Sequence, residues 1–411
     1  MSKAEIVRGV NGLGARWAEH ALADGRQTVL MPAGVWPLLG LVAPAGSPAV
    51  RRELEDVLGL PADAASERAR QLLGLLGDMP GTSAALGLWT AQGVRPRPEW
   101  LAGLPADVIG RLTGDPELDR KTLDAWASRC TDGLIDAMPV QVDENTRFVL
   151  ASALTVKTEW IRRFSPGGYV DGDTWGRDVE YLSRSTSLLD RAAVADTPAG
   201  PVTEVRVLGK HDIDVHLLLG EPDAPAGAVL AAGFGILAHR HPRVTADRLP
   251  TGTPGPGLTI GWQRSYLREP VLAVCVPQFT VEADHDLLEH RGLFGLTTAS
   301  RPSATENHLP GLSGDDEPLV VASARQAATA SFGPRGFRAA AVTALGVAIG
   351  AAASLPPYSV RHVRADFGRP FGFLAVHRTS GLVLAAGWVT DPDDYKDPWA
   401  DFGDEDDELP E

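Results

Sequence analysis

Histidines occur at two places with a spacing that would suit metal binding or proton transfer. His239 and His241 lie two residues apart, and His285 and His290 lie five apart. A zinc site needs three or four ligands, and no cysteine or carboxylate stands near the first pair to complete a set. The second pair falls on different faces of a helix, because neighbours on one face are three or four residues apart. We therefore predict a surface loop around the first pair, a surface helix at 282–292, and no metal site.

The other reactive side chains do not form a known catalytic pattern. Cys130 and Cys275 are too few for a disulfide framework, so we expect two free thiols. The sequence contains no phosphate-binding loop, no dinucleotide-binding glycine motif between a strand and a helix, no serine-hydrolase elbow and no zinc-protease motif. We therefore expect neither an enzyme nor a bound cofactor.

The charge of the chain excludes two classes of partner. The 411 residues carry 38 basic and 53 acidic side chains, a net charge of −15. Such a balance disfavours nucleic acid and anionic membranes. Residues 391–411 alone hold eleven carboxylate side chains against one lysine. We predict a solvated, disordered acidic tail at 393–411, with docking onto a basic partner or onto the body of the protein as the alternative.

The first residues lack the uninterrupted apolar stretch of a signal peptide, because charged side chains interrupt "MSKAEIVRGVNGLGARW". We expect a cytoplasmic protein, with export by a non-classical route as the alternative.

Hydrophobic periodicity predicts the elements that would position any site. Ile6, Val10, Leu13 and Trp17 have helical spacing, and Asp115 followed by proline is typical of a second helix start. Residues 146–160 are mostly apolar on both alternating phases, which indicates a strand buried on both faces. Residues 203–219 alternate as a hairpin, and further strands are expected at 271–279 and at 370–389. Strands and helices do not alternate as βαβ units, so we predict one α+β domain over residues 1–392.

Residues 336–354, "GFRAAAVTALGVAIGAAAS", raise a separate question, because no charge occurs from Ala339 to Leu355. The run is shorter than the roughly twenty apolar residues that a bilayer requires. Its glycines and β-branched residues disfavour a buried helix. From 344 onward large and small side chains alternate, as in a strand with one filled face. The segment is a potential strand of mostly small side chains, suited to sliding into an existing sheet.

Five segments, in the same order and at similar intervals, resemble the serpin family over roughly residues 5–392. "FGRPFGFLAVHRTSGLVLAAGWVTDP" at 367–392 is similar to the family's closing signature. "FVLASALTVKTEW" at 148–160 is similar to its central strand, with Lys157 and Trp160 in the expected places. The other three are "TVLMPAGVWPLLGLVAPAG" (28–46), "VLAVCVPQFTVEADHDLLEHRGL" (271–293) and "PLVVASARQAA" (318–328).

The resemblance implies a fold and a mechanism. The fold would have three β-sheets, about nine helices and an exposed reactive-centre loop at about 336–357. A serine protease would attack this loop and form an acyl-enzyme. The cleaved loop would then enter the central sheet and trap the protease, with free energy from a metastable native state. The loop hinge would comprise Gly336, Phe337, Arg338, Ala339, Ala340, Ala341, Val342 and Thr343.

Two positions for the scissile bond follow from the resemblance. Counting forward from Gly336 gives Gly350–Ala351, and matching the segment after the loop gives Ala353–Ser354. Either choice puts a small residue at the specificity position. We therefore expect an elastase-like or subtilisin-like target and a monomeric inhibitor.

The hinge and the sheet depart from the family pattern. At the hinge, Pro334, Phe337 and Arg338 replace a Glu, a Thr or Ser, and an acidic residue. A bulky Phe337 on the inward phase would cost about 1–3 kcal/mol to bury if no pocket existed.

The polar cluster that gates the family's central sheet is also altered. Ser152 replaces its asparagine and Arg325 its buried histidine, and with Lys157 and Trp160 these form the expected sheet gate. Met31 and Gly34 replace two serines, so the gate would be different or absent. Two functions follow as hypotheses: suicide inhibition of a serine protease, or a non-inhibitory role in ligand binding, scaffolding or recruited catalysis.

Overall fold

The structure is a computed structural model that describes residues 3–105, 108–140, 142–143, 146–303, 305–313, 318–337 and 356–395. Within these ranges it contains seven α-helices, fewer than the nine that the resemblance implied. The helices are α1 (Lys3–Ala21), α2 (Pro32–Val42), α3 (Pro48–Leu58), α4 (Ala62–Gly77), α5 (Pro98–Ala102), α6 (Pro116–Cys130) and α7 (Ala226–Leu237). None of these helices combines the length and the apolar character needed to span a bilayer.

The strands form three sheets. The central sheet has the order β3 (Ile109–Leu112), β2 (Thr82–Ala91), β4 (Phe148–Val156), β16 (Ser323–Phe332), β17 (Gly336–Phe337), β5 (Thr158–Glu159), and β15 (Phe279–Asp286) also pairs with β16. The second sheet has the order β1 (Thr28–Leu30), β20 (Leu382–Val389), β19 (Phe371–His377), β10 (Ile213–Leu219), β9 (Gly200–Val207), β8 (Ala192–Thr197), β11 (Arg243–Thr245). The third has the order β12 (Gly252–Gly255), β13 (Leu258–Ser265), β18 (Tyr358–Asp366), β14 (Val271–Pro277), β7 (Tyr181–Thr186), β6 (Ser165–Pro166).

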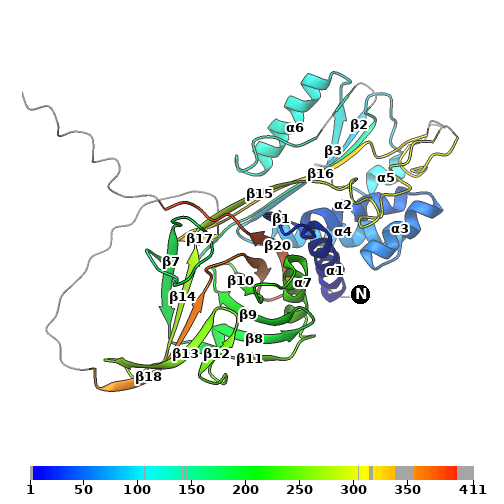
Figure 1. Ribbon diagram of the computed structural model, residues 1–411. Coiled ribbons are helices and arrows are strands. Elements are labelled where there is room, and N and C mark those ends of the chain that lie inside the picture. The colour runs from blue at the N-terminus through cyan, green and yellow to red at the C-terminus, as the bar shows by residue number, and fades with distance from the viewer. Residues whose placement is uncertain are drawn as a thin grey trace, which may run out of the picture.

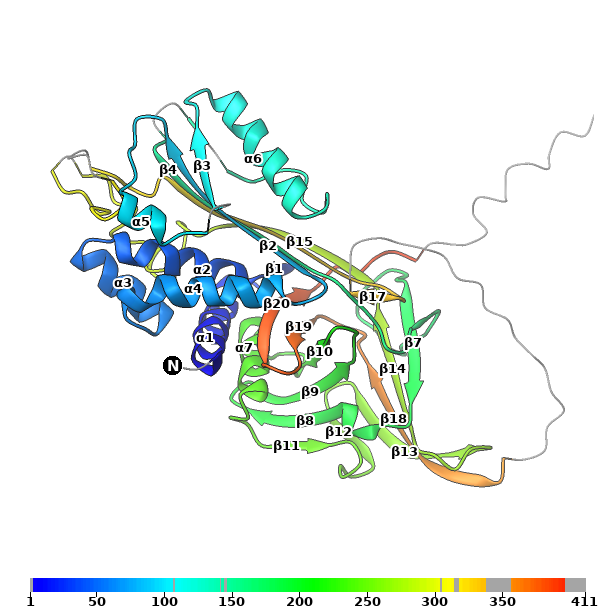
Figure 2. The ribbon, with the colours of Figure 1, turned by 180° about the vertical axis from the view of Figure 1, so that it is seen from behind.

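The helices lie on both sides of the central sheet. Helix α6 covers one face at the upper end of the molecule, and α1 to α4 gather on the other side (Figures 1 and 2). The strands of the second sheet lie below the central sheet, next to α7. This mixed arrangement confirms the predicted α+β class with three sheets.

Both predicted helices form at the expected places. The side chains of Ile6, Val10, Leu13 and Trp17 are buried along one face of α1. At the start of α6, the Asp115 carboxylate accepts hydrogen bonds from the backbone N–H groups of its second and third helical residues. The pairing occupies two of the donors that a helix start leaves without a partner.

The long strands β4 and β16 are buried on both faces, as predicted for the first of them. Every residue of β4 is buried. Its even-numbered apolar side chains pack into the main core, and Val149, Ala151 and Ala153 pack in a second core beneath Leu123 and Trp126 of α6. Successive side chains of a strand point to opposite faces, so the even face is directed inward and the odd face toward α6.

The prediction of a surface helix at 282–292 is wrong. Residues up to Asp286 belong to strand β15, which pairs along β16 from Phe279↔Phe332 to Asp286↔Arg325. Within it, the His285 ring lies 4.9 Å from the Trp17 ring, and its Nε2 lies 2.8 Å from the Val29 carbonyl oxygen. Pairing with the long strand β16, rather than local periodicity, determines the extended conformation of residues 279–286.

The described chain continues past residue 392 against the body of the protein. The Asp393 N–H donates to the Gln278 carbonyl, at 2.9 Å, and Asp393 Oδ2 accepts from the Gln278 side chain, at 3.0 Å. Arg177 forms ion pairs with Asp391 and Asp394. The acidic segment is therefore attached as far as Tyr395, and residues 396–411 lie outside the described ranges.

Candidate functional site

The central sheet is closed at one end and parted at the other. Strands β4 and β16 pair in parallel from Val149↔Ser323 to Ala153↔Ala327. Beyond these pairs a narrow cleft separates residues 154–156 of β4 from residues 329–331 of β16, and Leu134 and Ile135 complete its lining. The sheet thus has a slot between two of its strands, on the side covered by α6.

Strand β17 fills the open end of this slot. Phe337 pairs with Phe332 of β16 on one side and with Thr158 of β5 on the other, both antiparallel. A Cβ at Gly336 would lie 2.2 Å from the Thr158 carbonyl oxygen, so only glycine fits between the strands there. The first two residues of the predicted loop hinge are therefore already a strand of the sheet.

A pocket exists for Phe337, which removes the predicted packing penalty. Its side chain is 1% exposed, and its ring centroid lies 5.7 Å from that of Phe373 on β19, in an edge-to-face arrangement. Such aromatic pairs are favourable beyond the area they bury. Phe337 points inward, as expected from its phase, and anchors β17 to the second sheet.

Trp160 holds the residues that lead into β17. Its backbone N–H donates to the Arg335 carbonyl, at 2.9 Å, and its indole Nε1–H donates to the Gly333 carbonyl, at 2.8 Å. The ring lies 4.8 Å from the ring of Phe332. Its neighbour Lys157 lies at the rim of the slot and pairs with Asp132 at 2.9 Å.

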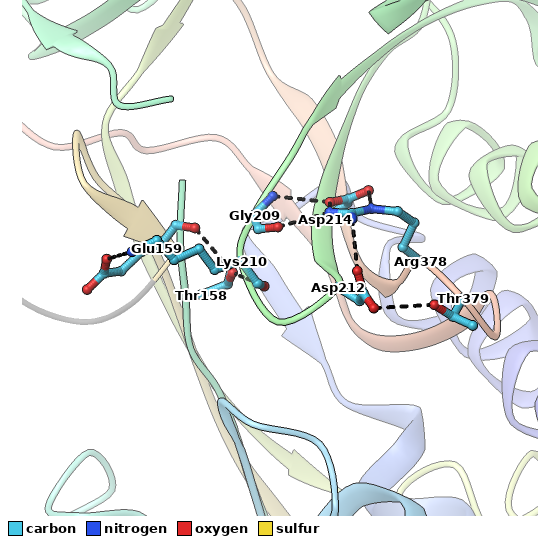
Figure 3. Close-up of polar contacts among 8 residues, drawn as sticks. All are labelled: Thr158, Glu159, Gly209, Lys210, Asp212, Asp214, Arg378 and Thr379. Carbon is cyan, nitrogen blue, oxygen red and sulfur yellow. Dashed lines mark hydrogen bonds and ion pairs between the residues drawn. The ribbon is translucent and has the colours of Figure 1, made fainter. Parts of the chain in front are cut away.

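The turn between β9 and β10 clamps β5 from the far side (Figure 3). Lys210 Nζ donates to the Glu159 carboxylate and its backbone N–H to the Glu159 carbonyl, both at 2.8 Å. The Thr158 hydroxyl donates to the Lys210 carbonyl at the same distance. The hydrogen bond from Lys210 lowers the pKa of the exposed Glu159 carboxyl. These contacts fix β5, the strand that pairs with β17.

Arg378 stabilises the turn between β9 and β10 through several hydrogen bonds (Figure 3). Its guanidinium donates to both carboxylate oxygens of Asp214, at 2.8 and 2.6 Å, and to Asp212 at 2.9 Å. It also donates to the Gly209 carbonyl at 2.9 Å, and the Gly209 N–H donates to Asp214 at 3.1 Å. The hydrogen bonds to Asp214 raise the pKa of Arg378. Because Arg378 bonds both oxygens of the Asp214 carboxylate, the pair holds the two side chains in one orientation and also neutralises the buried charge of Asp214.

A buried polar cluster lies at the closed end of the slot. The Gln326 side chain accepts from the Met31 N–H and donates to the Met31 carbonyl, both at 3.0 Å, and its Nε2 lies 3.4 Å from Ser152 Oγ. All three residues are fully buried. This buried polar cluster joins β16, β4 and the residue before α2, at the place where the resemblance implied a gate.

The assignment of Arg325 to this gate is wrong. Arg325 points to the α6 side of the sheet and pairs with Asp286 on β15, at 2.9 Å. Gln326, one residue later, faces inward and partners Ser152 in the sheet register. The sequence of β16 indicates this orientation, because Gln326 lies on the same alternating phase as the buried residues Ala324 and Ala328.

The remaining predicted hinge residues and the candidates for the scissile bond belong to segments outside the described ranges. Arg338, Ala339, Ala340, Ala341, Val342 and Thr343 lie outside the described residues, as do the scissile-bond candidates Gly350, Ala351, Ala353 and Ser354.

The parts of the chain that the structure describes contain no group of three histidine, cysteine or acidic side chains arranged to hold a metal ion. Within the described residues neither Cys130 nor Cys275 forms a disulfide, and burial raises the pKa of the Cys275 thiol to about 11. The site can accept an additional strand between β4 and β16, because β17 occupies only the open end of the slot between them.

Comparisons with known proteins agree with this geometry. The family model described as "Serpin (serine protease inhibitor)" matches residues 15–177. A relative from Oryza sativa subsp. japonica, "Putative serpin-Z12", is 28% identical over 92% of this chain and 89% of its own length. The "Serine proteinase inhibitor 1" of Myxoma virus is 23% identical over 72% of each chain.

A solved structure with a similar fold is that of the thermophilic serpin tengpin in its native state, with a TM-score of 0.72, 15% identity, and 95% of each chain covered. A thyroxine-binding globulin in complex with thyroxine has a TM-score of 0.71, 14% identity, and covers 96% of this chain and all of its own. At these identities the likeness concerns the fold, which both neighbours share.

Proposed function

Because this chain belongs to the serpin family, we propose that it inhibits serine proteases as a suicide substrate, by inserting its cleaved loop into the central sheet. The observation that carries the proposal is β17. Gly336 and Phe337 already occupy the open end of the slot, where they lie between β16 and β5. Cleavage further along the loop would release the residues after Phe337 to continue this strand.

The register of β17 supports continued insertion. If the pairing is kept for six more residues, Thr343 comes to lie opposite Gln326 on β16 and Ser152 on β4, which are each other's present partners. Phe337 points inward, so the alternating residues Ala339, Ala341 and Thr343 would also point inward. Alanines would fill the slot, and the threonine hydroxyl would meet the polar gate.

The same register would direct Arg338 to the α6 side, opposite Lys157, with Asp132 as the nearby negative charge. Because Arg338 and Lys157 carry the same charge, this pair would oppose insertion except as far as Asp132 offsets the repulsion. The far end of the loop is fixed as well, because β18 is an interior strand with β13 on one side and β14 on the other.

The target that the sequence favours is a protease that cleaves after small residues, since both candidate bonds follow Gly350 or Ala353. The test incubates the protein with an elastase-type and a subtilisin-type protease. We expect a covalent complex that survives SDS, and a higher melting temperature for any cleaved, uncomplexed protein.

A matched pair of variants makes this test specific. Thr343→Arg would place a charged side chain between Gln326 and Ser152, so complex formation should be lost while cleavage continues. Thr343→Ser should retain the complex. Cleavage of the natural chain within 345–354 without a complex and without a rise in melting temperature would refute inhibition and leave a non-inhibitory role.

A further inference from the structure

A pocket of about 560 Å³ opens beside β17, at the end of the central sheet that lies away from α6 (Figure 1). Its walls come from four separate segments: Gly81, β5 with the residue before it, the turn between β9 and β10, and residues 333–336. The lining residues that matter here are Lys157, Glu159, Lys210, His211, Arg335 and Gly336. It is a concave site whose lining combines charged side chains with glycine and proline, and such sites can bind ligands.

The pocket is basic in a strongly acidic protein. Lys157 and Lys210 are two of only five lysines in the chain, and Arg335 adds a third permanent positive charge. Lys157 pairs with Asp132, and Lys210 with Glu159. The side chain of Arg335 forms no hydrogen bond or ion pair within the described ranges, so the lining keeps an excess of positive charge. Such a site favours a carboxylate-rich ligand.

The wall that carries Lys210 and His211 is rigidly built. His211 and Asp212 both have left-handed backbone conformations, with φ values of 55° and 57°. Non-glycine residues keep such conformations only where the surroundings enforce them. The enforcement comes from Arg378, which binds Asp212, Asp214 and the Gly209 carbonyl (Figure 3). The turn that carries Lys210 and His211 is therefore held in place by the protein itself, before any ligand binds.

The acidic end of the chain passes close to this pocket at Asp393, two residues before the last described residue, Tyr395. Asp393 is bound to Gln278 through two hydrogen bonds, and a Cβ at Gly333, a lining residue, would lie 4.0 Å from Gln278 Oε1. Residues 396–411 add sixteen more positions, which in extended form span up to roughly 50 Å. That length is ample to reach back to the pocket, because the segment begins only three residues after Asp393.

The composition of residues 396–411 matches the pocket. They contain eight acidic residues and one lysine, for a net charge of −7. Trp399, Phe402 and Leu409 alternate with the charges and suit the uncharged part of the lining, which includes Gly81 and Pro334.

We propose that the acidic segment 396–411 binds in cis to this basic pocket, with carboxylates against Lys157, Lys210 and Arg335. The proposal stands whether or not the chain inhibits proteases. If the chain is an inhibitor, the bound segment would contact Gly336 and so affect the hinge from which the loop inserts.

Zero-length cross-linking of the full chain with a carbodiimide tests the proposal, because it joins a lysine only to a carboxylate that it already contacts. We expect monomeric products that link Lys157 or Lys210 to residues 397–411, identified by mass spectrometry. Their yield should fall at least tenfold in 1 M salt, which screens the attraction. Links from the segment only to Lys3 or Lys121, or only in dimers, would overturn binding in cis.

A pair of charge-matched variants separates pocket binding from general attraction. Arg335→Ala should lower the yield of these cross-links severalfold, because it removes a positive charge from the pocket but no cross-linkable amine. Arg240→Ala removes the same charge from an exposed site beyond α7 and should leave the yield unchanged. Equal effects of the two substitutions would refute a specific site. Neither readout depends on a protease.

Discussion

Replacement of Gln326 by methionine should weaken the native state of this protein more than any neighbouring change of similar size. Methionine keeps the volume and shape of the glutamine side chain but removes its amide. The Met31 N–H then loses its partner at 3.0 Å, and Ser152 Oγ loses its contact at 3.4 Å. The Met31 carbonyl keeps a second partner, the Gly34 N–H at 2.9 Å.

The expected cost follows from these contacts. Each lost hydrogen bond contributes about 1 kcal/mol, and a buried N–H without a partner costs about 1–3 kcal/mol. We therefore expect a loss of about 2–4 kcal/mol in the free energy of unfolding. At the lower end this corresponds to a roughly 30-fold faster unfolding rate, if the bonds are broken in the transition state.

The assay is the rate of unfolding in urea, followed by tryptophan fluorescence, because a metastable protein is best compared by kinetics. Arg325→Met is the matched control. It removes the mostly buried ion pair with Asp286 from the other face of the same strand, but the Asp286 carboxylate keeps the Leu288 N–H as a partner, so we expect a loss of about 1 kcal/mol. If Arg325→Met accelerates unfolding as much as Gln326→Met, the assignment of the gate to Gln326 is refuted.

Two further predictions concern the turn that clamps β5 and the histidine of β15. Arg378→Ala should cost about 3–5 kcal/mol, because the buried Asp214 carboxylate, 1% exposed, loses its cation and keeps only the Gly209 N–H as a hydrogen-bond partner. Arg177→Ala, whose acidic partners are exposed, should cost about 1 kcal/mol or less in the same thermal melts, and similar losses for the two variants would contradict this role of Arg378. Burial lowers the pKa of His285, so below the ordinary histidine pKa of about 6.5 the unfolded chain takes up a proton that the folded chain resists. Stability should therefore be complete above that pH and fall as the pH drops toward the lowered value; His285→Gln should have a flatter profile between pH 7.5 and 5.5, and an unchanged slope would refute this role.

Much of the architecture could be predicted because it follows from local patterns. The apolar stripe of α1, the Asp115 cap of α6 and the doubly apolar strand β4 each depend on residues close in sequence. Segment 282–292 was mispredicted because its residues up to Asp286 take their conformation from pairing with β16, which lies some forty residues further along the chain. Local periodicity does not record such a partner.

By itself, the sequence determined the class of fold, the family resemblance and the inward phase of Phe337, since alternation and motif order are properties of the chain alone. Only the tertiary structure decided that a pocket beside Phe373 accepts this side chain, and that Gln326 rather than Arg325 closes the gate. It also brought Lys157, Lys210 and Arg335 together from three distant segments. Packing, strand register and charge clusters depend on which distant segments meet in space, and local sequence patterns do not give the distances between such segments.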